Sequence, residues 1–155
     1  MPVIDGLNQC QPLLKSPTWT YNQGVLIGGL IALNGITHDR GLLATARRVA
    51  DAVIRSPVLS PHGVLREPCE TGSSCDAGET LFKGIFIRNL SRLDSRAAGA
   101  PYRAYLRRNA SSVWDRDRRA DEFGLSWSGP FDRADTARQA AALDALTAGI
   151  QADRA

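Results

Sequence analysis

Metal-ligand and redox residues are scarce in this sequence of 155 residues, which has three cysteines and two histidines. Cys69 and Cys75 flank a short polar loop that a local disulfide can close, and Cys10 is left over. A zinc site made from the three cysteines and His62 would have a spacing that matches no known ligand pattern. Neither His38 nor His62 has a nucleophile or ligand arrangement around it. We therefore expect no metal and no cofactor, and a disulfide between Cys69 and Cys75, which favours an oxidising compartment.

Long apolar runs and a large excess of one charge are also missing. The longest apolar run, residues 24–33, is half of the roughly 20 residues that cross a bilayer, and the first residues lack the basic start and apolar core of a secretory leader. The net charge is only +3, from 19 basic residues against 16 acidic ones, and the densest charged segment, residues 103–122, mixes both signs. Such a segment is typical of a solvated helix face and loop rather than of a phosphate-binding patch. We expect no membrane span and no nucleic-acid partner.

What the sequence does contain is hydrophobic periodicity of the helical kind. A chain of 155 residues that is 43% hydrophobic can form one domain with a core, which we place at residues 1–155. The periodicity predicts an all-α fold, with an irregular segment at residues 58–76 that has room for a short hairpin and a glycine-rich loop at 123–131. The five expected helices cover residues 21–37, 39–55, 76–93, 102–114 and 134–152.

These helices alternate in character along the chain. The first, third and fifth are apolar nearly all round, whereas the second and fourth carry one apolar stripe. This alternation predicts two layers, in which the inner helices contact protein on all sides and the outer helices expose one side to solvent. Asn22, Glu79 and Thr136 stand near the starts of the inner helices at a constant spacing of 57 residues. This spacing indicates a repeated helix pair that either closes into a toroid or stacks as an open solenoid.

The first inner helix contains Gly24, Gly28 and Gly29. Each glycine inside a helix costs roughly 1 kcal/mol relative to alanine, so we expect close packing against neighbouring helices to offset the cost. Asp39 is expected to cap the second helix, and the spacing of Asp76 and Glu79 is that of a capping box at the start of the third.

Four segments resemble the family-76 glycoside hydrolases: Asp5–Leu7, Trp19–Gly28, Phe82–Arg88 and Gly124–Phe131. Members of that family are endo-acting α-1,6-mannanases with an (α/α)6 toroid, and the bacterial ones are mostly secreted. The resemblance covers only the C-terminal part of the family's domain. It therefore implies a partial (α/α)6 toroid of about five helices, an incomplete C-terminal portion of such a domain, a mannan-type polysaccharide as partner and an extracellular location.

The family's chemistry, as the resemblance implies, rests on two consecutive aspartates in the N-terminal half of its domain. One acts as nucleophile and the other as general acid and base, and retaining hydrolysis needs the two carboxyl groups about 5 Å apart. No such pair occurs here, and the adjacent carboxylates Asp121 and Glu122 precede a loop in an arginine-rich stretch. We assign no catalytic residue to this chain and expect it not to cleave a glycosidic bond unaided.

Five residues are candidates for substrate binding under this resemblance. Tyr21, Asn22 and Gln23 stand at an inner helix start, where the family's cleft lies and where unpaired backbone donors favour sugar hydroxyls. Asn22 and Gln23 could bind mannose hydroxyls or Asn22 could cap the helix, and Tyr21 could stack on a sugar ring. Lys83, on a mostly buried helix, must line a wet cleft or be ion-paired. Trp127 could be a sugar platform or a buried anchor of its loop.

Two classes of function remain open. The chain is part of an endo-α-1,6-mannanase-like glycosidase, or it is a non-catalytic carbohydrate-binding or helical interaction module. Arg88 is expected to form a structural ion pair, and Trp19 and Trp114 are expected to have packing roles, Trp114 because it continues the stripe of its helix. Five helices cannot close a ring of twelve, so the inner helices should expose an apolar flank, which predicts self-association.

Overall fold

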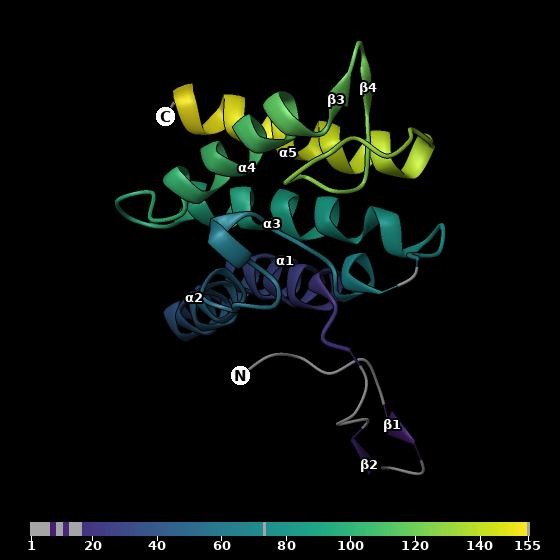
Figure 1. Cartoon of the computed structure of the whole chain (residues 1–155). Helices are drawn as coiled ribbons and strands as arrows, with labels where there is room; N and C mark the ends of the chain where they lie inside the picture. The colour runs from purple at the N-terminus through teal and green to yellow at the C-terminus, as the bar shows by residue number, and fades with distance from the viewer. Residues whose placement is uncertain (1–6, 9–10, 13–16, 73, 155) are drawn as a thin grey trace.

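The computed structural model describes residues 7–8, 11–12, 17–72 and 74–154 (Figure 1). Cys10 and most of the Asp5–Leu7 segment lie outside the described residues. Five α-helices dominate, as predicted, and no described helix combines the length and apolarity needed to cross a membrane. The elements in chain order are β1 (Leu7–Asn8), β2 (Gln11–Pro12), α1 (Thr20–Thr37), α2 (Arg40–Ile54), the 3-10 turns η1 (Pro61–Gly63), η2 (Pro68–Thr71) and η3 (Glu79–Leu81), α3 (Phe82–Arg96), α4 (Arg103–Arg116), β3 (Arg118–Arg119), β4 (Glu122–Phe123) and α5 (Thr136–Arg154).

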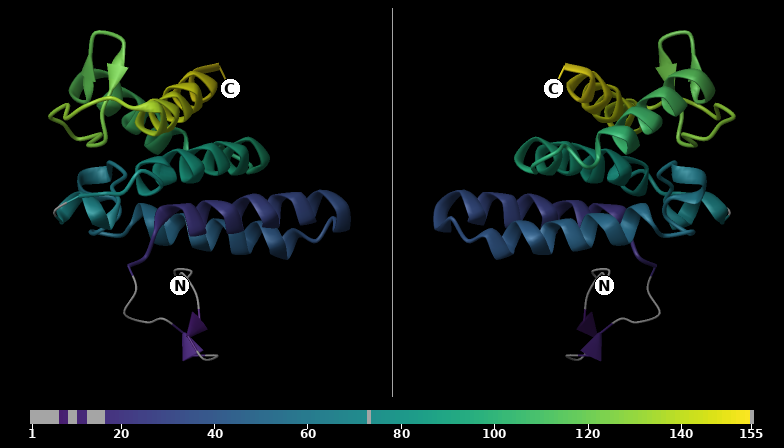
Figure 2. Two further views of the ribbon diagram at one scale, coloured as in Figure 1. Left: turned by 90° about the vertical axis from the view of Figure 1, so that its right-hand side faces the viewer. Right: turned by 90° about the vertical axis from the view of Figure 1, so that its left-hand side faces the viewer.

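The helices form the two layers that the alternation predicts. Helices α1, α3 and α5 pack side by side in one row with α3 in the middle, while α2 packs on α1 and α4 on α5. Figure 2 shows that the three inner helices start at the same end of the molecule, where the 3-10 turns and the β3–β4 hairpin also lie. The row is an open arc, so its first and last helices each have one side without a neighbouring helix among the described residues.

Local capping explains where the helices begin. The Asp39 carboxylate accepts a hydrogen bond from the Gly41 N–H at the start of α2. Asp76 and Glu79 bond each other's backbone N–H groups at 2.8 Å, so the capping box is confirmed, and η3 then continues directly into α3. At α5 the Asp135 carboxylate accepts from the Arg138 N–H.

The predicted hairpin at residues 58–76 is wrong. That segment contains η1 and η2, whose prolines start 3-10 turns, and within residues 17–72 and 74–154 the one hairpin is β3–β4. Its strands pair Arg119 with Glu122 around a turn in which Ala120 adopts a positive φ of 54°. The sequence carries no glycine or asparagine there, which is why the turn gives no signal.

Two glycines let the inner helices approach closely. A Cβ on Gly24 of α1 would lie 2.7 Å from the Cα of Phe86 on α3, and a Cβ on Gly84 of α3 would lie 2.7 Å from the Cα of Ala141 on α5. Gly28 faces the Asn89 side chain at a similarly short distance. Gly29, in contrast, has nothing within 4 Å of its Cβ position, so the predicted close packing is wrong for this residue.

Burial follows the position of each helix in the arc. Helix α3 is buried on both sides, and α2 presents one buried stripe. Helices α1 and α5 are not buried all round: at the two ends of the row they expose Val25, Leu33, Ile36, Leu143 and Ile150. This apolar exposure is the flank expected for an incomplete ring.

Arg88 pairs with Asp144 between α3 and α5 at 3.9 Å, which confirms its structural ion pair. Trp19 packs edge-on against Phe82. Trp114 packs only in part, with its ring centroid 6.2 Å from that of Phe123. The indole is half exposed at the last turn of α4, and the Arg118 guanidinium covers its ring at 3.8 Å.

Candidate substrate-binding end of the inner helices

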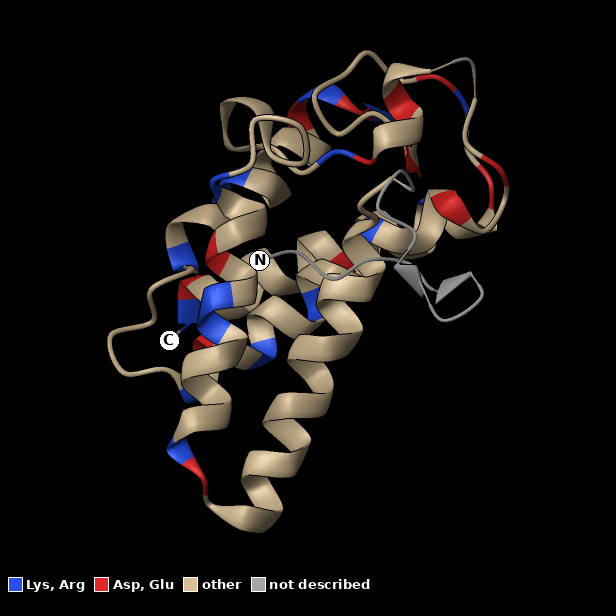
Figure 3. Ribbon diagram, turned by 90° about the horizontal axis from the view of Figure 1, so that it is seen from below, with Lys and Arg blue, Asp and Glu red and all other residues tan. Residues whose placement is uncertain are grey.

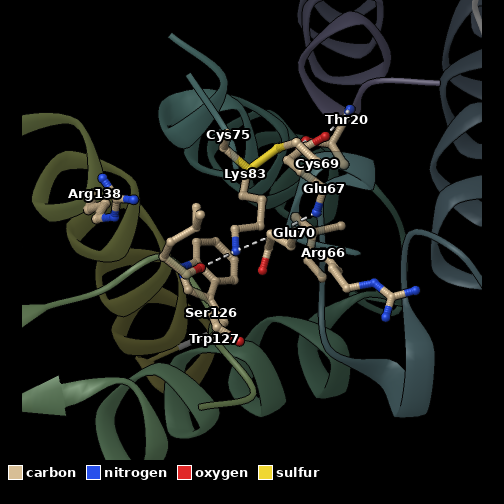
Figure 4. A network of polar contacts seen from close by, with 12 residues as sticks. Thr20, Arg66, Glu67, Cys69, Glu70, Cys75, Lys83, Ser126, Trp127 and Arg138 are labelled. Carbon is tan, nitrogen blue, oxygen red and sulfur yellow. Dashed lines mark hydrogen bonds and ion pairs between the residues drawn. A yellow bond between two sulfur atoms is a disulfide. The ribbon is translucent and has the colours of Figure 1, made fainter. Parts of the chain in front are cut away.

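Lys83 is the centre of a buried polar network beneath the start of α3 (Figure 4). Its ammonium is fully buried, donates to Glu70 Oε1 at 2.7 Å and to the Leu125 carbonyl, and lies 4.6 Å from the centroid of the Trp127 ring. The ion-paired interpretation of Lys83 is therefore confirmed. A desolvated ammonium is tolerated here because a carboxylate, a carbonyl and an aromatic face surround it. Trp127 is 1% exposed, which agrees with its role as a buried loop anchor.

Glu67 connects this network to the start of α1. The carboxylate is fully buried and accepts hydrogen bonds from both the backbone N–H and the hydroxyl of Thr20. The Glu67 N–H in turn donates to the Glu70 carboxylate, which pairs with Lys83. Burial raises the pKa of Glu67 to about 8, although the bonds from Thr20 act in the opposite direction. Sequence reasoning missed Glu67, whose only signal was a glutamate before proline with Glu70 three residues later.

A second buried carboxylate, Asp117, lies behind the glycine-rich loop. Neither of its oxygens accepts a hydrogen bond within the part of the chain that the structure describes. Burial raises its pKa to about 8. A Cβ on Gly124 would collide with both Asp117 Oδ1 and Asp132 Oδ1, so only glycine fits between the two carboxylates. Asp117 gave no signal because it stands in a charged run whose mixed signs are typical of a solvated surface.

Asp132 differs from Asp117 because its charge is satisfied. Its carboxylate accepts from the Leu125 N–H at 2.9 Å and pairs with the buried Arg138 at 3.2 Å. Burial raises the pKa of Asp132, but the backbone bonds from Leu125 and Arg133 outweigh it and hold the pKa below its usual value. Arg138 also pairs with Asp135, so α5 starts from an ion-paired turn.

The five predicted contact residues separate into two depths. Tyr21 and Asn22 are half-buried at the start of α1, where the Tyr21 ring lies 4.2 Å from that of Phe82. Gln23 is fully buried and donates to the Trp19 carbonyl, and Lys83 and Trp127 also lie beneath the surface.

Helix α1 begins at Thr20, so Asn22 lies inside the helix and is not its N-cap. The Thr20 N–H at this start donates to Glu67. Contact of any of the five residues with a sugar stays a prediction.

A surface depression of about 360 Å³ adjoins this network. The disulfide between Cys69 and Cys75 borders it, as predicted, with a Cα–Cα distance of 5.0 Å. These sulfurs and the Glu79 carboxylate are the one group of potential metal ligands at close spacing in the described residues, but disulfide sulfurs are not thiolates and do not ligate zinc. The depression is lined by Cys69, Glu70, Gly72, Ser74, Cys75, Leu125, Ser126, Asp132, Arg133 and Arg138.

The fold is that of an all-α protein built from helix pairs, a partial (α/α) toroid. Buried polar side chains form a layer beneath the starts of its inner helices. The chain belongs to glycosyl hydrolase family 76, whose profile matches residues 1–155.

Solved structures share the fold at 21–23% identity. The Lin0763 protein from Listeria innocua has a TM-score of 0.82 at 23% identity, over 97% of this chain and 42% of that one. The GH76A α-1,6-mannanase from Salegentibacter sp. HEL1_6 has 0.80 at 22%, over 94% and 44%, and an inactive double-aspartate variant of it is known in complex with an α-1,6-linked mannotetraose. Dfg5 from Chaetomium thermophilum, in complex with glucosamine, has 0.74 at 21%, over 90% and 37%. The chain thus spans about two fifths of the length of these proteins. The comparison with curated proteins gave no match.

Proposed function

We propose that this chain forms one wall of the substrate cleft of a glycosidase acting on α-1,6-mannan. The observation that carries the proposal is the common start of α1, α3 and α5 at one end of a family-76 fold. Polar and aromatic side chains at a protein surface suit the hydroxyls and ring faces of a sugar, and half-buried Tyr21 and Asn22 stand at the start of α1. Glu67, Lys83 and Trp127 support this surface from below.

The catalytic carboxylates, on this proposal, belong to sequence outside these 155 residues. Asp121 and Glu122 are both exposed at the β3–β4 turn, on a charged hairpin rather than in a cleft between the inner helices. Asp117 and Asp132 are close together, but Asp117 is fully buried and out of reach of a glycosidic oxygen. The chain by itself should therefore bind sugar without cleaving it.

Binding to α-1,6-mannotetraose, measured by titration calorimetry beside β-1,4-mannotetraose, tests the proposal. We expect preference for the α-1,6 sugar, and about tenfold weaker binding in Tyr21→Ala through loss of an aromatic contact. Trp114→Ala is the matched control, because this half-exposed indole lies on α4 and its loss should leave the affinity unchanged. Equal binding of both sugars, or none, would contradict the proposed substrate class.

A second candidate is a non-catalytic carbohydrate-binding or helical interaction module, which the missing aspartate pair favours. Immunoblotting of the native source separates the two candidates. A band well above 16.7 kDa that carries these residues supports the glycosidase, and a band of that size supports the module. Release of reducing sugar by the isolated chain would contradict our assignment of the carboxylates to other sequence.

We also propose that the protein works in an oxidising, extracellular compartment, as its disulfide suggests. Thiol labelling of protein taken directly from the source, with and without reductant, tests this. Cys69 and Cys75 should be labelled only after reduction, and labelling without reductant would contradict the location.

A further inference from the structure

A cavity of about 710 Å³ lies at the end of the inner helices opposite to the proposed sugar-binding end. It is bordered by the last turns of α3 and α5, the first turn of α4 and the loop between α3 and α4. Figure 1 shows this loop at the left of the molecule and the start of α3 at the right. A volume of this size is typical of pockets that hold a small organic molecule.

The charges of this cavity come from the helices and are mainly positive. Residues 97–102 carry no charge, and their loop is tan throughout in Figure 3. Arg92 of α3 and Arg103 of α4 line the cavity, and Asp94 is the one acidic residue among the described residues that do so. The Asp94 carboxylate is 6% exposed and accepts a hydrogen bond from the Tyr102 N–H at 2.7 Å. Two guanidinium groups against one carboxylate favour an anion.

Arg103 has a buried donor that nothing in the described part of the chain satisfies. Its Nε has no hydrogen-bond partner there, and its guanidinium forms no ion pair with a described residue. The buried Nε of Arg138 also lacks a partner, but that guanidinium pairs with Asp132 and Asp135 through its other nitrogens. Because a buried charged donor is costly without an acceptor, Arg103 calls for a ligand. The planar guanidinium matches the two oxygens of a carboxylate or phosphate.

The neighbouring side chains add further donors and one acceptor. Arg92 uses Nη1 to bond Asn89 Oδ1 at 3.3 Å, and its remaining nitrogens are available to a ligand. The Ser91 hydroxyl donates to Gln151 Oε1 at 2.8 Å, which leaves the amide NH2 of Gln151 as a donor. Asp94 supplies an acceptor for a hydroxyl group. The lining therefore suits a molecule that carries both an oxyanion and hydroxyls.

We infer that this cavity binds a small organic oxyanion, a phosphate or carboxylate on a hydroxylated carbon skeleton of the size of a sugar phosphate or sugar acid. Arg92 and Arg103 hold the oxyanion, and Asp94 accepts from a ligand hydroxyl. The buried side chains of Ala97 and Leu106 form the apolar part of the lining, against which the carbon skeleton packs. The inference does not rest on the proposed function, because the two sites share no residue.

Titration calorimetry with the 155-residue chain at constant ionic strength tests the inference. The probes are mannose 6-phosphate, glucuronate, inorganic phosphate and mannose. We expect mannose 6-phosphate or glucuronate to bind at least about tenfold more tightly than inorganic phosphate, and mannose not to bind. The stronger of the first two identifies the oxyanion as a phosphate or a carboxylate. Binding of neither, or equal binding of inorganic phosphate, would overturn the inference.

Variants of the lining locate the site. Arg103→Gln should weaken binding by about 10- to 100-fold, because a charged hydrogen-bonding partner is lost. Ser95→Asp keeps the test valid if Arg103→Gln folds poorly, since Ser95 is exposed and a carboxylate there should repel the ligand. Arg96→Gln is the matched control, because it removes the same charge from the exposed end of α3 outside the lining.

An equal loss of affinity in the control and in Arg103→Gln would mean that only the overall charge attracts the ligand, and it would overturn the inference. Affinity that neither Arg103→Gln nor Ser95→Asp changes would do the same. Circular dichroism checks that the variants keep their helices. Titration with α-1,6-mannotetraose is a separate measurement, so a failure of the proposed function is recognised independently.

Discussion

The start of the inner helices buries charged side chains, whereas the open side of α1 exposes apolar ones. At the start, Lys83, Glu67 and Asp117 are fully buried, and the first two are held by partners from distant parts of the chain. Along the open side of α1 no residue is charged, yet apolar side chains face solvent. The first region thus pairs its buried ammonium within the chain, whereas Val25, Leu33 and Ile36 of α1 remain exposed in the described part of the chain.

Breaking the buried ion pair should have the largest effect. Lys83→Met leaves the Glu70 carboxylate and the Leu125 carbonyl without their buried donor, so we expect the free energy of unfolding to fall by about 3–5 kcal/mol. Urea denaturation measures it. Adding Glu70→Gln should recover part of the loss, because no uncompensated charge remains. Arg55→Met, which breaks the exposed pair with Asp51, is the control and should cost less than about 1 kcal/mol.

The disulfide that borders the same region ranks next. Replacing Cys69 and Cys75 by serine frees a short loop in the unfolded chain, since the two cysteines are 6 residues apart, and loop-closure entropy then predicts a loss of about 2 kcal/mol. Thermal unfolding with and without reductant measures it. Reductant should lower the Tm of the unmodified chain and leave that of the double variant unchanged. An equal drop in both would mean that the bridge contributes nothing to stability.

Much of the fold could be predicted because it depends on local pattern. Periodicity gave five helices, and Asp39 and the Asp76 and Glu79 pair marked two of their starts. Lys83 stands in a helix that is otherwise apolar, so the sequence could predict that its ammonium needs a charged partner or a wet cleft. Its partner Glu70, and Glu67 beside it, could not be predicted, because both stand in a turn segment that no periodicity describes. The exposure of Trp114 was missed because it stands at the spacing of the apolar stripe of α4, whereas its indole is half exposed in the structure.

Asp117 tests whether a buried carboxyl group without hydrogen-bond partners weakens the start of the inner helices. Its pKa is about 8 in the folded protein against an ordinary value of 3.8, so the folded state holds an extra proton between these values and stability falls as pH rises from about 4 to 8. Asp117→Asn removes this titration. We expect a gain of about 1 kcal/mol at pH 8, the lower end of the usual range because the amide also lacks partners, and little gain at pH 4.

Denaturation curves across this pH range measure the effect. Glu67, whose pKa is also about 8, keeps part of the slope in the variant, so the pH dependence should become shallower without vanishing. The exposed Asp121→Asn is the control and should leave the slope as it is. A slope that Asp117→Asn does not change would mean that Asp117 is ionised and solvated in the folded protein.

The glycines of α1 give the smallest expected effect and compare the two regions within a single helix. Gly29→Ala adds a methyl group to open space, so at concentrations where the chain is monomeric the free energy of unfolding should rise by about 0.5–1 kcal/mol from helix propensity alone. Gly24→Ala gains the same propensity but places its methyl group 2.7 Å from the Phe86 Cα, a backbone atom that cannot move aside, and a net loss should result. Urea denaturation of both variants beside the unmodified chain measures the pair. Opposite signs would follow from one side of α1 being packed and the other open, whereas a loss in both would mean that the open side is already covered in the monomer.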